Sequence, residues 1–86
     1  MNEMYIISFN STQQAIKCDK LFGKNEMDYT VLPTPRELTQ SCGMSIAFAI
    51  EDIDNIKEII NQNQIEYKGI YKIYKQDGKK QVEEIN

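Results

Sequence analysis

The hydrophobic pattern of the chain switches between the two-residue period of strands and the 3.6-residue period of helices. Residues 4–9 form a short aromatic and β-branched run, and a helical stripe begins after Ser11. Two strand-like runs follow, then a helical stripe of isoleucines, then a last strand-like run over residues 67–74. With right-handed crossovers, this order predicts an α+β, ferredoxin-like βαββαβ fold, in which two helices back a four-stranded antiparallel sheet.

Local signals predict where the helices begin and end. Ser11 and Gln14 have the spacing of a capping box, and Gly23 is expected to close the first helix. Glu51 or Asp52 can cap the second helix, which is expected to end near residue 62.

The length of 86 residues is enough for one compact core. We expect a single domain over residues 1–74 and a C-terminal extension over residues 75–86. Asp77 and Gly78 lie between two strand-like runs, which favours a hairpin that adds one strand to the sheet. A frayed, charged tail is the alternative, and the sequence leaves both open.

Composition excludes several classes of function. The net charge of -3 and the lack of clustered Lys and Arg argue against nucleic-acid binding. Without histidine the chain has no cysteine–histidine or serine–histidine pair for nucleophilic catalysis, and a zinc site would need thiolates and carboxylates alone. We therefore expect no metal and no cofactor. The apolar run near the start is too short for a signal core or a membrane span, so we expect a cytoplasmic protein without membrane attachment.

The third predicted strand has one face of small side chains. Bulky residues alternate there with Ser45, Ala47 and Ala49. This face lacks the stacking aromatic residues of an RNA-recognition sheet. Because both helices should cover the opposite face, we expect the C-terminal hairpin or a second copy in a homodimer to pack on it.

Residues 32–43, which we call the proline segment, hold the groups best suited to chemistry. The segment contains both prolines, the only arginine and Cys42. The predicted topology brings it to the end of the sheet where the first helix begins, and free helix N–H groups there favour an anion such as a thiolate. The expected anion- or partner-binding residues at this end are Asn10, Ser11, Thr12, Arg36, Ser41, Gly43 and Lys68.

The environment of Cys42 stays open at this point. If residues 35–41 form a short helix capped by Gly43, the thiol lies at the negative end of that helix and is harder to ionise. Cys42 can also be a small buried apolar residue. Cys18 falls on the apolar stripe of the first helix and is expected to pack rather than react.

Four stretches carry a family resemblance: residues 5–11, 32–38, 41–46 and 65–71, with the Pro-Thr-Pro-Arg and Ser-Cys-Gly elements as the most specific parts. Together they resemble small bacterial proteins described as selenium/sulfur (Se/S) carrier-like, and the likeness ends near Tyr74. The resemblance implies that Cys42 carries sulfur or selenium as a persulfide or selenosulfide between a donor and an acceptor protein, without enzymatic turnover of its own. The alternative function is a non-catalytic module that binds a small anion or a protein partner.

Overall fold

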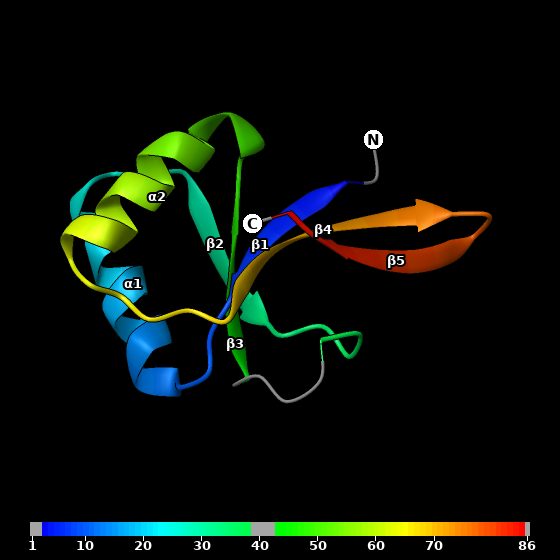
Figure 1. The fold of residues 1–86 in the computed structure, drawn as a ribbon, viewed down its shortest axis with the longest axis horizontal. Helices are drawn as coiled ribbons and strands as arrows, with labels where there is room; N and C mark the ends of the chain where they lie inside the picture. Colours follow the sequence, from blue (N-terminus) through cyan, green and yellow to red (C-terminus); the bar gives the residue numbers. More distant parts are fainter. Residues whose placement is uncertain (1–2, 39–42, 86) are drawn as a thin grey trace.

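The computed structural model describes residues 3–38 and 43–85. Two helices pack on one face of a five-stranded antiparallel sheet with strand order β2-β3-β1-β4-β5 (Figure 1). The predicted α+β class, with two helices and an antiparallel sheet, is confirmed. The elements in chain order are β1 (Met4–Ser8), α1 (Thr12–Lys24), β2 (Tyr29–Pro33), β3 (Met44–Phe48), the 3₁₀ turn η1 (Ile50–Asp52), α2 (Ile53–Gln62), β4 (Gly69–Gln76) and β5 (Lys79–Glu84).

Helix α1 begins where its sequence predicts and ends later. The Ser11 hydroxyl accepts a hydrogen bond from the Gln14 N–H at 3.2 Å. The helix runs past Gly23, and Asn25 is its C-terminal cap. The prediction that Gly23 closes the helix is therefore wrong. Gly23 instead leaves room for the Tyr29 hydroxyl, which would lie 3.2 Å from a Cβ atom at this position.

Helix α2 has its cap residue at the predicted place, but the capping bond is absent. Asp52 is the N-cap residue, yet its side chain makes no capping hydrogen bond. The reason is that Asp52 also ends the 3₁₀ turn, with φ near -94° and ψ near 5° rather than the extended backbone of an ordinary N-cap.

The hydrophobic core lies between the two helices and the sheet. Fully buried side chains from both layers include Ile7, Phe9, Phe22, Ile46, Ile56 and Ile70. Cys18 belongs to this core, as predicted, with an exposed fraction of 0%. Burial, with a smaller contribution from Asp19, raises the pKa of the Cys18 thiol to about 12. Cys18 is therefore a neutral thiol at pH 7 and packs as a small apolar side chain.

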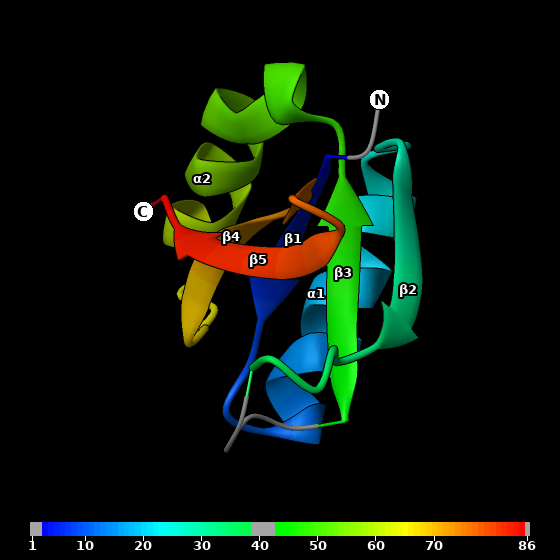
Figure 2. The same ribbon diagram turned by 90° about the vertical axis from the view of Figure 1, so that its right-hand side faces the viewer.

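The C-terminal residues form the hairpin alternative. Strand β4 continues to Gln76, past the expected boundary at residue 74, and pairs with β5. Asp77 and Gly78 both have positive φ, 54° and 76°, as a two-residue type I′ turn requires. Figure 2 shows the hairpin crossing the sheet on the side opposite the helices, which we call the hairpin face. Ile6 and Ile73 point to this face and are 0% and 3% exposed, so one chain already buries them.

Candidate functional site

The described part of the proline segment, residues 32–38 and 43, lies at the end of the sheet where α1 begins, in the lower part of Figure 2. Ser8, the last residue of β1, pairs with Ser45 in β3 and with Gly69 in β4. The end of β1 and the beginnings of β3 and β4 therefore lie side by side at one end of the sheet. This is the end to which the predicted topology brings the proline segment.

Main-chain hydrogen bonds shape the described part of the proline segment. The Thr34 N–H donates to the Gly43 carbonyl at 3.1 Å, which closes the segment at its base. The Leu38 N–H donates to the Pro35 carbonyl at 3.0 Å, which makes a single turn. The helix considered for residues 35–41 is replaced by this turn over its described part.

The structure describes two of the four predicted site residues in the proline segment, Arg36 and Gly43. Ser41 and Cys42 lie outside the described residues. Gly43, which directly follows Cys42 in the chain, is described and exposed. Arg36 is exposed in the turn and forms no ion pair with any residue that the structure describes.

Hydrogen bonds also join the connection between α2 and β4 to this end of the sheet. The Lys68 N–H donates to the Ser8 carbonyl at 2.7 Å. The Gln14 side chain accepts from the Glu66 N–H at 3.0 Å. The capping box is therefore only half formed, because Gln14 ties the connection to α1 instead of reaching back to Ser11.

The remaining predicted residues lie at the beginning of α1. Asn10, Ser11 and Thr12 are exposed, and the Ser11 hydroxyl is already engaged by the Gln14 N–H. The main-chain bond from Lys68 to Ser8, two residues before Asn10, brings the connection alongside this helix start.

Sequence reasoning missed a row of hydroxyl groups at this end of the sheet, on the hairpin face. Thr34 Oγ1 and Ser45 Oγ lie 2.8 Å apart. Ser8, opposite Ser45 in the sheet, is 0% exposed, and its hydroxyl has no hydrogen-bond partner among the described residues. The Tyr71 hydroxyl lies over Gly69, 2.8 Å from where a Cβ atom would stand. The residue types were visible in the sequence, but their meeting depends on strand register.

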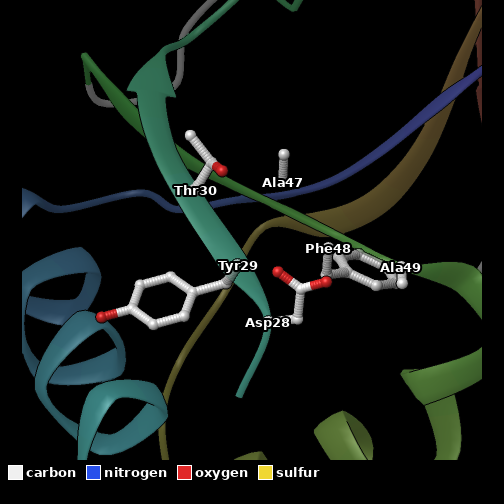
Figure 3. A pocket seen from close by; sticks show the side chains of 6 residues that line it. All are labelled: Asp28, Tyr29, Thr30, Ala47, Phe48 and Ala49. Carbon is white, nitrogen blue, oxygen red and sulfur yellow. The ribbon is translucent and has the colours of Figure 1, made fainter. Parts of the chain in front are cut away.

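A surface hollow of about 200 Å³ lies at the opposite end of β3 (Figure 3). It is lined by Asp28, Tyr29, Thr30, Ala47, Phe48 and Ala49. The Tyr29 ring points away toward α1, where its hydroxyl donates to the Asp19 carboxylate at 2.7 Å. Asp28 is then the charged group at the hollow, and the lining offers no thiol. The end of the sheet that holds these hydroxyl groups and the proline segment is the better candidate site.

Two further absences apply to the described part of the chain. Across residues 3–38 and 43–85, no group of three or more Cys, Asp or Glu side chains gathers in a way that could hold a metal ion. Neither described helix is long and apolar enough to cross a membrane.

Comparison with known proteins identifies the family. Neither the curated proteins nor the solved structures include a significant match to the chain. A family model described as "Putative Se/S carrier protein-like" matches residues 4–72. The matched region contains the whole proline segment and most of the sheet, and it ends before β5. The chain therefore belongs to the Se/S carrier protein-like family.

Proposed function

We propose that the chain is a carrier that holds a sulfur or selenium atom on Cys42 and passes it from a donor protein to an acceptor protein. The observation that carries this proposal is the family match over residues 4–72, which includes Cys42. The hydrogen bond from Thr34 to Gly43 supports it, because it fixes the residue directly after Cys42 to the end of the sheet. A carrier needs two partners and no turnover of its own.

Loading is an exchange at sulfur. The Cys42 thiolate attacks the outer sulfur of a donor persulfide, R–S–SH, and forms a new S–S bond. The donor S–S bond breaks, and its electron pair leaves with the donor thiolate, R–S⁻. The product Cys42–S–SH releases its proton to solvent. In delivery, an acceptor thiolate attacks the outer sulfur and Cys42 leaves as a thiolate. With selenium, the outer atom differs and the balance is the same.

The predicted anion-binding residues belong to this proposal. The N–H groups at the start of α1, at Asn10, Ser11 and Thr12, can face a negative charge, and the side chains of Arg36 and Lys68 can balance it. Support comes from the exposure of the three helix-start residues. The main-chain bond between Lys68 and Ser8 supports the place of Lys68 beside them.

We infer in addition that the fold is ferredoxin-like, with β5 as an added strand. The antiparallel order β2-β3-β1-β4 and the placement of both helices on one face support this assignment. The pairing of β5 with β4 and the packing of Ile85 against the core support one domain that includes residues 75–86.

Mass spectrometry after incubation with glutathione persulfide tests the carrier function. We expect one added sulfur on the peptide that contains Cys42. The Cys42→Ser variant should lose this adduct, whereas Cys18→Ala should keep it, because Cys18 is buried and neutral. Unmodified wild-type protein would contradict the proposal.

A binding measurement separates the carrier from the alternative function. If a partner protein binds Cys42→Ala as tightly as the wild type but no longer binds Arg36→Ala, and the wild type transfers no sulfur to it, the chain is a non-catalytic binding module. Loss of transfer in Cys42→Ala with intact partner binding is the result expected for a carrier.

A further inference from the structure

Strand β2 is an edge of the sheet, and its outer side is open. The described sheet ends at β2, and Figure 2 shows no described strand beyond it. The Thr34 N–H donates to the Gly43 carbonyl, so the main chain of Thr34 faces β3. Because alternate residues of an antiparallel strand bond to the same neighbour, the main chain of Tyr29, Val31 and Pro33 faces outward. The outer side of β2 is therefore a row of peptide groups that no described strand pairs.

The two edges of the described sheet differ in charge. Most side chains of β5, the other edge strand, are charged: Lys79, Lys80, Glu83 and Glu84. Such charges discourage pairing with another strand. In contrast, β2 has no charged residue, and Val31 at its centre is 39% exposed. Pro33 removes an N–H only at the end of the strand. Of the two edges, β2 is therefore the one suited to accept another strand.

An exposed apolar side chain of α1 lies on the same side of the molecule. The Tyr29 hydroxyl donates to the Asp19 carboxylate at 2.7 Å, which holds the beginning of β2 against this helix. From Asp19, one turn back along α1 leads to Ile16, which is 42% exposed. From Tyr29, two residues along β2 lead to Val31 in the same direction, because the helix and the strand run in opposite directions (Figure 2). Exposed apolar groups of both elements therefore lie along this open edge.

The outward peptide groups of β2 are complementary to those of a second β2. A two-fold axis through Val31 pairs this residue with Val31 of a second copy, and the two exchange main-chain hydrogen bonds. Two positions along, the Tyr29 N–H meets the Pro33 carbonyl of the second copy, and the same bond forms on the other side of the axis. Every outward N–H of the strand then has an acceptor. Pro33, which has no N–H, acts only as an acceptor.

The charges at the two ends of β2 suit the same arrangement. Asp28 precedes the strand and Arg36 follows it, and both are exposed. Arg36 forms no ion pair with any residue that the structure describes. Antiparallel pairing about Val31 brings Asp28 of one copy opposite Thr34 of the other, two residues before Arg36. Unlike charges therefore approach each other at each end of the pair, whereas a parallel arrangement would bring like charges together.

We propose that two copies of the chain associate through β2, in an antiparallel pair centred on Val31 that joins their sheets into one. The occupant of the edge is a second copy, because the donors, the acceptors and the end charges of β2 match those of β2 itself. A contact limited to one strand and the adjacent helix belongs to the small, transient class of interfaces. It leaves the hairpin face free, and it is independent of the carrier function.

Sedimentation from micromolar to millimolar concentrations, in reducing buffer so that no disulfide joins two chains, tests the association. The average mass should rise from that of one chain toward that of two. Val31→Lys should stay at the mass of one chain, because the pair would place two lysines directly opposite each other. Met4→Lys is the matched control and should associate like the wild type. Met4 is 37% exposed, but it lies in the central strand β1, on the hairpin face.

Amide hydrogen exchange tests the register of the pair. With about nine-tenths of the copies paired, exchange of the Tyr29 and Val31 N–H groups should slow about tenfold relative to dilute protein, because only unpaired copies exchange them. The Thr30 and Leu32 N–H groups, which face β3 in both states, are internal controls and should change far less.

Three results would overturn the proposal. The first is a mass that stays at one chain up to millimolar concentration. The second is an association that Met4→Lys abolishes and Val31→Lys preserves, because the contact would then lie on the hairpin face. The third is an association that leaves exchange at Tyr29 and Val31 unchanged, because the contact would then not be a pairing of β2.

Discussion

Cys18 shows how strongly burial acts on a single ionisable residue. Its side chain is 0% exposed, and the pKa of its thiol rises from 9.0 to about 12, first because of desolvation and then because of Asp19. The folded core therefore accepts the neutral thiol and excludes the thiolate.

This property predicts a loss of stability in alkali. The unfolded thiol ionises near pH 9.0, whereas the folded thiol keeps its proton up to about pH 12. The contribution to stability is complete below pH 9 and is lost as the pH rises toward 12. At pH 10 the loss relative to pH 7 should be about 1.4 kcal/mol.

Urea unfolding of wild type and Cys18→Ala at both pH values checks the prediction. Tyr29 and Tyr71 also have raised pKa values and contribute in both proteins. The difference between the two declines therefore reports the thiol together with its small effect on the pKa of Tyr29. Parallel declines would rule out Cys18 as a source of the pH dependence.

Residue-level chemistry was only partly predictable from the sequence. The helical spacing around Cys18 correctly places it in the core, because periodicity reports which face of a helix is buried. That the Ser8 hydroxyl has no hydrogen-bond partner among the described residues could not be predicted. Whether a serine in a strand finds a partner depends on its neighbours across the sheet, and the register sets those neighbours.

Helix and strand boundaries were predictable where local side-chain bonds set them. Ser11 caps α1 through a residue three positions away, and Asp77 with Gly78 supplies the two positive φ angles of the hairpin turn. The end of α1 was not predictable. The helix runs past Gly23 to its cap at Asn25, and Gly23 leaves room for the Tyr29 hydroxyl, a contact that exists only in the folded chain.

The cap of α1 gives a prediction at the scale of this helix. Ser11→Ala should reduce the free energy of unfolding by about 1 kcal/mol, because the Gln14 N–H loses its acceptor. Ser11→Asp should retain the wild-type stability, since aspartate also caps and its charge suits the helix start. Urea unfolding of the three proteins is the measurement. Equal losses in both variants would show that the hydroxyl has a role other than capping.

At the scale of the whole molecule, the helices cover one face of the sheet and the C-terminal hairpin crosses the other. Strand β5 lies outside the family match over residues 4–72, yet its hairpin crosses the sheet face that contains Ile6 and Ile73. The Ile85 N–H also donates to the Ile70 carbonyl at 3.0 Å. The hairpin thus covers this face of the sheet. The sequence could not decide between a hairpin strand and a frayed tail, because that choice depends on burial across the entire sheet.

Deletion of residues 77–86 should promote self-association. The deletion uncovers Ile6 and Ile73 and leaves the edge of β4 unpaired, and both changes favour association between copies. Light scattering at micromolar concentrations should give a mass that rises more steeply with concentration than for the full chain. Lys80→Ala is the control, because it alters an exposed hairpin residue and keeps the cover. Identical masses for the full and shortened chains would contradict this role of the hairpin.

The buried thiol of Cys18 can also report how often the fold opens. A water-soluble alkylating reagent reaches Cys18 only when α1 separates from the sheet. The rate at which Cys18 is labelled therefore measures how often the fold opens. Under the proposed carrier function, a cargo that contacts only the native fold makes such openings rarer. Labelling of Cys18 in protein with and without a loaded Cys42 therefore measures, at the second cysteine, how much the cargo stabilises the fold.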